Sequence, residues 1–129
     1  MKKIEIKEII KHLNQVPAIT NIIWSENIFW WLPSNENKSK MYVIFDIISD
    51  ISDPIKTQTR IEVRIIANNS IVLNSEIQEL DTLIEKEMLE NFKFGTFHCY
   101  NIISEEGKSF FSEKDRKTFI RDYLIYFVN

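Results

Sequence analysis

Alternating or continuous runs of hydrophobic residues divide the chain into five stretches that are typical of β-strands. In the last of them, residues 118–128, nine of eleven positions are apolar, aromatic or β-branched, and no Gly or Pro interrupts them. Read at period two, both faces of this stretch are mostly apolar. We therefore expect it in the middle of a sheet, covered on both sides by other elements or by a partner subunit.

Four earlier stretches predict the remaining strands: residues 27–32, closed by Pro33, and residues 41–48, 60–67 and 96–103. The stretch 41–48 resembles the C-terminal one in being apolar on both faces, so we expect these two strands at the sheet centre. In residues 60–67, by contrast, apolar and polar positions alternate. One side of this strand should be core, whereas Arg60, Glu62 and Arg64 should face water or a polar interface.

Helical periodicity appears twice. Residues 2–15 carry apolar positions at i, i+3, i+4 and i+7, and Pro17 should end that helix, with a second short helical turn to follow. Ser75 and Gln78 match a capping box, which begins a helix predicted over residues 75–91. Its apolar stripe should pack across one face of the sheet.

Two connections are unusual because they combine loop signals with large apolar residues. Residues 49–59 contain Asp50, Asp53 and Pro54, which favour a loop. Ile51 and Ile55 nevertheless lie in this segment. The polar connection 104–117 carries the adjacent Phe110 and Phe111. Because such residues are hard to bury locally, we expect them to contact other chains.

The chain of 129 residues is expected to form one α+β domain, residues 1–129, with a mostly antiparallel sheet of about five strands. An N-terminal helix and a second long helix should pack on this sheet. A net charge of −3 gives no electrostatic reason to expect nucleic-acid binding. Cys99, the single cysteine, excludes an internal disulfide framework, and we expect neither a signal peptide nor a membrane span.

Candidate chemical groups are sparse. His98 and Cys99 are adjacent, but neighbouring strand residues point to opposite faces and cannot easily share a metal ion. His12 is expected at the surface of the first helix. A loose acidic group could bind a divalent cation but lacks the glycine and terminal glutamate of a calcium loop, so turn formation is the favoured role; its members are Asp46, Asp50 and Asp53.

Neither a G-x-S-x-G elbow nor a Gly-rich phosphate loop occurs. We therefore expect no catalytic residue, no cofactor and no metal site, and we do not expect an enzyme. Trp24, Trp30 and Trp31 could stack on bases or sugars, but core or interface packing is favoured. An alternative is a small homodimeric module in which the Trp-rich strand forms a ligand or peptide pocket.

The apolar surface exceeds what two helices can cover, so homo-oligomerisation is the default inference. The interface candidates are Ile51, Ile55, Arg60, Glu62, Arg64, Phe110 and Phe111.

In its order of elements, the chain resembles the tail-terminator (tail-completion) proteins of long-tailed bacteriophages. The resemblance rests on Tyr42-Val-Ile-Phe-Asp46, on Arg60-Ile-Glu-Val-Arg-Ile-Ile66 and on the terminal pattern aromatic-Ile-x-Asp-Tyr-x-Ile-x-Phe. This last pattern is Phe119-Ile-Arg-Asp-Tyr-Leu-Ile-Tyr-Phe127 here, and it is similar to the final strand of many such proteins. Another small phage neck or head-tail connector protein would fit a similar pattern.

The resemblance implies a structural virion protein that forms a ring, usually a hexamer, at the tail-neck junction. Such a ring caps the tail tube, ends tail elongation and provides the surface for head-tail joining. The implied partners are further copies of the chain, the tail tube protein and a neck or head-completion protein. Assembly would take place in the host cytoplasm, without a membrane and without sequence-specific nucleic-acid binding, although DNA could pass through the ring. No catalytic residue follows from the family.

Overall fold

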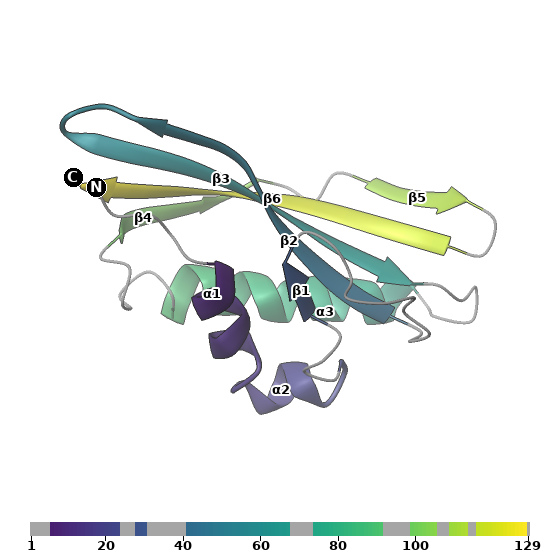
Figure 1. Ribbon diagram of the computed structural model, residues 1–129. Helices are drawn as coiled ribbons and strands as arrows, with labels where there is room; N and C mark the ends of the chain where they lie inside the picture. Colours follow the sequence, from purple (N-terminus) through teal and green to yellow (C-terminus); the bar gives the residue numbers. More distant parts are fainter. Residues whose placement is uncertain are drawn as a thin grey trace.

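The structure is a computed structural model, and it describes residues 6–23, 28–30, 41–67, 74–91, 99–105, 109–113 and 116–128. One sheet forms a layer, and the helices form a second layer against one of its faces (Figure 1). Among the described residues, no helix covers the opposite face. This arrangement confirms the predicted α+β class.

The N-terminal part of the helical layer consists of two short helices. Helix α1 (Ile6–Leu13) buries Ile9 and Leu13, which lie one turn apart on the same side. Helix α2 (Pro17–Thr20) begins at a proline, whose fixed φ suits a first helical turn and whose missing N–H needs no partner there. The predicted break at Pro17 is thus confirmed.

The second long helix, α3 (Asn74–Lys86), continues directly into the π-helical turn η2 (Glu87–Asn91). Its buried residues form the predicted stripe: Ile77, Leu80, Ile84 and Met88. Most of the stability of such a helix comes from packing this stripe against the sheet. The expected range, 75–91, agrees with the observed one to within a residue.

The described sheet has six strands: β1 (Ile28–Trp30), β2 (Met41–Ser52), β3 (Lys56–Ala67), β4 (Cys99–Ser104), β5 (Ser109–Glu113) and β6 (Arg116–Val128). Their order is β1-β2-β3-β6-β4, and β5 pairs with β6 beside β4. Only β1 runs parallel to its neighbour, while the other pairs are antiparallel.

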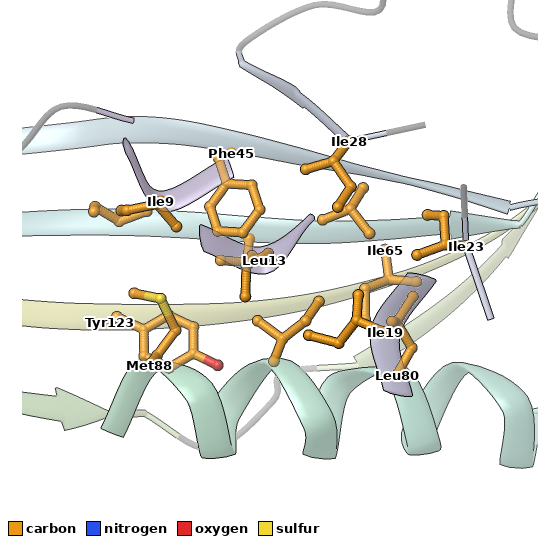
Figure 2. Close-up of a cluster of buried hydrophobic side chains, with 14 of the residues drawn as sticks. Ile9, Leu13, Ile19, Ile23, Ile28, Phe45, Ile65, Leu80, Met88 and Tyr123 are labelled. Carbon is orange, nitrogen blue, oxygen red and sulfur yellow. The ribbon is translucent and has the colours of Figure 1, made fainter. Parts of the chain in front are cut away.

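Side chains on the helix-facing side of the sheet form the core. Phe45 of β2, Ile65 of β3 and Tyr123 of β6 point toward Leu80 and Met88 (Figure 2). All five are buried. Since side chains alternate between faces, the intervening positions of these strands lie on the opposite, helix-free face.

Three expectations from the sequence need correction. Residues 49–59 do not form a loop, because β2 extends to Ser52 and β3 begins at Lys56, which leaves a tight turn. Asp and Pro marked the turn correctly, but turn residues do not limit how far strands extend.

The connection 104–117 is likewise not a loop throughout, because it contains β5, which forms a hairpin with β6. The polar composition of this connection did not predict a strand, because β5 is held by backbone pairing with β6. Finally, β2 and β6 are both inner strands, but they do not lie side by side, because the alternating strand β3 lies between them at the sheet centre. Hydrophobic periodicity indicates which faces of a strand are covered, but it does not indicate the position of that strand in the order of the sheet.

Candidate assembly surface

The helix-free face of the sheet carries a row of acidic residues across three neighbouring strands. Glu62 of β3 lies opposite Asp46 of β2 on one side and opposite Asp122 of β6 on the other. Like charges directly opposite one another on a sheet are destabilising. The face therefore needs compensating cations, and β3 supplies them.

Arg64 forms an ion pair with Glu62 of the same strand. Arg60 Nη1 lies 3.0 Å from Asp122 Oδ2 and 2.9 Å from Glu105 Oε1. Hydrogen bonds to Glu105 and then to Asp122 raise the pKa of Arg60. Each arginine is thus held in a defined position on the helix-free face.

Next to these charges, the helix-free face carries both apolar and polar residues. The register places Ile51 of β2, Gln58 of β3, Tyr126 of β6 and Asn101 of β4 in one row across the sheet. In the adjacent row, Ile103 of β4 lies opposite the half-buried Leu124 of β6. Ile51 is 66% exposed and Ile103 is 42% exposed, at opposite sides of the sheet.

The β2–β3 hairpin extends beyond the helical layer (Figure 1). At its tip, Asp53 Oδ1 accepts hydrogen bonds of 2.8 Å from the amides of both Ile55 and Lys56. These two bonds lower the pKa of the Asp53 carboxyl group because they favour its charged form. The turn is therefore well defined, and it presents Ile55 with 73% of its surface exposed.

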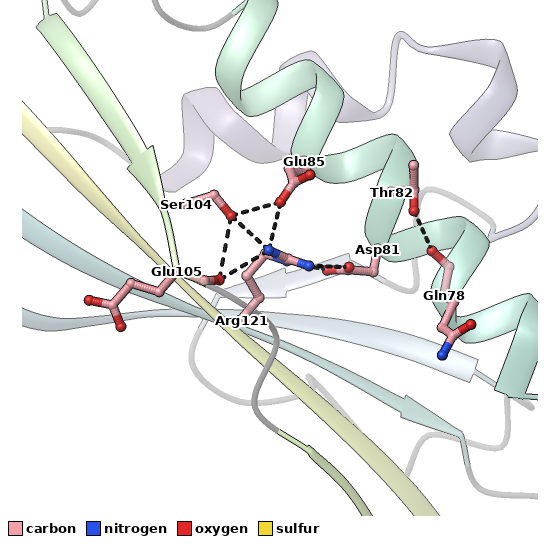
Figure 3. A network of polar contacts seen from close by, with 7 residues as sticks. All are labelled: Gln78, Asp81, Thr82, Glu85, Ser104, Glu105 and Arg121. Carbon is pink, nitrogen blue, oxygen red and sulfur yellow. Dashed lines mark hydrogen bonds and ion pairs between the residues drawn. The ribbon is translucent and has the colours of Figure 1, made fainter.

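On the opposite face of the sheet, Arg121 fastens β6 to α3 and to the end of β4 (Figure 3). Its Nε and Nη2 atoms donate to the two carboxylate oxygens of Asp81, both at 2.8 Å. Nη1 donates to Ser104 Oγ at 2.8 Å and to the Glu105 carbonyl at 3.0 Å, and it lies 2.6 Å from Glu85 Oε2. The bidentate pair raises the pKa of Arg121.

Glu105 therefore has partners on both faces of the sheet. Its carbonyl oxygen accepts from Arg121 on the helical side, whereas its carboxylate pairs with Arg60 on the helix-free side. Its amide also donates to the Asp122 carbonyl at 2.9 Å. The C-terminal end of β4 is thereby fixed against β6.

The seven predicted interface residues separate into three groups. Ile51 and Ile55 are exposed on the β2–β3 hairpin. Arg60, Glu62 and Arg64 lie together on the helix-free face, where both arginines already have partners in their own chain. Phe110 and Phe111 lie on β5, opposite Phe119 and Thr118, and the environment of their side chains falls outside the described residues.

Sequence reasoning missed Ile103 and the Arg121–Asp81 pair. Arg121 is a charged residue on the core-facing side of an otherwise apolar strand. This position could have predicted an ion pair, because a buried cation needs a partner. No signal in the sequence identified Asp81 as that partner, since it lies 40 positions away along the chain. Trp24, Trp31 and His98 fall outside the described residues.

Within the described ranges, no group of three or more His, Cys, Asp or Glu side chains could hold a metal ion. In the same part of the chain, no helix is long and apolar enough to span a membrane.

Comparison with known proteins places the chain by its fold. No protein-family model matches it, and no curated protein sequence does either. A solved structure described as "Virion of native gene transfer agent (GTA) particle" contains a chain with a similar fold, at a TM-score of 0.71 and 10% sequence identity. The match covers 94% of this chain and 92% of the other one. At this level of identity, the shared property is the fold over nearly the whole length of both chains.

Proposed function

We propose that this protein is a structural component of a phage-like virion and that it forms the ring that ends tail elongation. The observation that carries the proposal is the similarity of the whole fold to a chain of a gene transfer agent virion, which extends over 94% of the protein. The resemblance of the terminal pattern, residues 119–127, to tail-terminator proteins supports the same role.

The surface of the protein is consistent with assembly. One sheet face has no helical cover among the described residues, and exposed isoleucines lie on it and on the adjoining hairpin. Exposed apolar area of this kind favours contact with other proteins. In a closed ring, one patch of each subunit meets a different patch on the next subunit, so the two sides of the interface need not be alike.

In this ring, which we propose to be a hexamer, apolar and polar residues have separate roles. Ile51 and Ile55 supply the buried centre of a contact, and Arg60, Glu62 and Arg64 fix its register. Because both arginines are already positioned by carboxylates of their own chain, little side-chain freedom is lost when a partner binds.

The ring can form on the tail tube even if the subunit-subunit contact is weak. A symmetric tube end holds several subunits close together, and this raises their effective concentration. A monomer in dilute solution is therefore compatible with the proposal. The other proposed partner is the neck or head-completion protein that docks on the opposite side of the ring.

Omission of the protein from particle assembly tests the function. We expect tails of uncontrolled length that do not join heads, and we expect resupply of the wild-type protein to restore uniform, head-attached tails. Electron microscopy of both preparations measures tail length and the fraction of joined particles. Tails of normal length that remain unattached would assign the protein to another position in the neck, and normal, head-attached tails would refute the proposal.

A further inference from the structure

A continuous series of polar contacts crosses the sheet from α3 to the helix-free face. On the helical side, Asp81 accepts two hydrogen bonds of 2.8 Å from Arg121, and Arg121 Nη1 donates to the Glu105 carbonyl at 3.0 Å. On the helix-free side, the Glu105 carboxylate lies 2.9 Å from Arg60 Nη1. Each step involves a charged group, and hydrogen bonds of this kind are stronger than those between neutral groups.

Glu105 is the residue at which the two sides meet. The pairing of β4 with β6 ends at Ser104, one residue before Glu105. The position of Glu105 therefore depends on its own contacts. These include a hydrogen bond from its amide to the Asp122 carbonyl, a hydrogen bond from Arg121 to its carbonyl, and the ion pair of its carboxylate with Arg60. Figure 3 shows the carboxylate extending away from Arg121.

Arg60 compensates two carboxylates at once. Its Nη1 atom lies 2.9 Å from Glu105 Oε1 and 3.0 Å from Asp122 Oδ2. If the guanidinium group turned away, these two carboxylates would remain close together, and like charges repel each other. A protein that binds Arg60 therefore acts on the position of Glu105 as well.

We propose that Glu105 couples the two faces of the sheet, so that a contact which draws Arg60 away from Glu105 weakens the attachment of α3 through Arg121. This inference rests on the proposed assembly role, which supplies the protein that binds Arg60. Because linkage between two sites is reciprocal, a protein that binds the α3 side changes affinity at the helix-free face by the same factor. Contacts on the two faces of the subunit are then made in a preferred order.

A double-mutant cycle tests the coupling on the isolated subunit. Arg60→Gln and Asp81→Asn would be prepared singly and together, and urea denaturation would give the factor by which each variant raises the unfolding equilibrium constant. Factors from independent sites multiply. Because Arg121 has already lost part of its support when Arg60 is replaced, the combined factor should be more than about threefold smaller than the product of the single factors.

Arg64→Gln combined with Asp81→Asn is the matched control. Arg64 lies on the same strand and the same face as Arg60, but it pairs with Glu62 of its own strand, so these two factors should multiply. The Arg60 and Asp81 cycle would also be repeated in a Glu105→Ala background. There, the combined factor should come within about threefold of the product, because the connecting carboxylate is gone.

Hydrogen exchange keeps the proposal testable if a double variant does not fold. Arg60→Gln alone should raise the amide exchange rates of α3 by more than about threefold, and by more than those of β2. A local effect of the substitution would instead appear in β2, which pairs directly with β3 at this position. Circular dichroism verifies that each single variant is folded.

Single factors that multiply in the Arg60 and Asp81 cycle would overturn the proposal. A departure from the product that persists in the Glu105→Ala background, or that appears equally with Arg64→Gln, would also overturn it. The same holds for amide exchange that rises in β2 and not in α3. Each of these results would leave the terminator role standing, because the omission experiment tests that role separately on whole particles.

Discussion

Arg121 and Asp81 show how a charge is accommodated on the core-facing side of an apolar strand. Both carboxylate oxygens of Asp81 accept from one guanidinium group, and the remaining donors of Arg121 reach Ser104 and the Glu105 carbonyl. A buried ion pair adds little net stability, but loss of one partner leaves an uncompensated charge. The pair therefore makes the position of α3 on the sheet specific.

Asp81→Ala should lower the free energy of unfolding by about 2–4 kcal/mol, because among the described residues Arg121 then keeps only the partly exposed Glu85 as an anionic partner. The double variant Asp81→Leu/Arg121→Met should recover most of this loss, since it removes both charges. Urea denaturation measures all three proteins.

Glu79→Ala, an exposed position on the same helix, is the control and should change stability by less than about 0.5 kcal/mol. If the double variant were as unstable as Asp81→Ala alone, packing and not charge would explain the effect.

At the scale of elements, β5 shows how a strand can form without an apolar pattern. It pairs with β6 from Ser109 opposite Ile120 to Glu113 opposite Arg116. Backbone hydrogen bonds to a strand that is already held in the sheet stabilise such a segment without an apolar pattern. Whether the adjacent Phe110 and Phe111 serve assembly is a matter for mutation.

Phe110→Ser/Phe111→Ser should weaken oligomer formation while leaving the melting temperature of the subunit nearly unchanged, if these residues contact a neighbour or docking partner. Light scattering and a thermal melt measure the two properties. Phe119→Ser is the matched control, because Phe119 is buried and its truncation should cost about 3–5 kcal/mol. A double variant that fails to fold would identify the two phenylalanines as core residues.

At the scale of the whole molecule, apolar packing between one sheet and its helical layer accounts for the fold. The core is continuous from α1 and α2 through β2, β3 and β6 to α3. Within the described residues, no group of His, Cys, Asp or Glu could hold a metal ion. The sequence lacks a Gly-rich phosphate loop and metal-ligand spacing, and this predicts that folding depends on the polypeptide alone.

Treatment with a chelator should leave the melting temperature unchanged, because a ligand stabilises a fold only if it binds the native state. A thermal melt before and after EDTA treatment measures this. A decrease of several degrees would show that a bound metal ion supports the fold.

The sequence alone determined which segments form helices and most of the strands, since periods of 3.6 and 2 reflect which side of each element meets the core. It also singled out Ile51 and Ile55 as apolar residues in a segment with turn signals, and both are exposed. These features depend on neighbours within a few residues, so a local pattern can specify them.

Only the tertiary structure decided the order β1-β2-β3-β6-β4, the extension of β2 and β3 into one long hairpin, and the strand β5. It also decided that Arg121 pairs with Asp81. Each of these depends on contacts between segments that are distant in the chain. Backbone hydrogen bonds between strands can form with almost any side chain. Hydrophobic periodicity therefore does not predict which strands become neighbours.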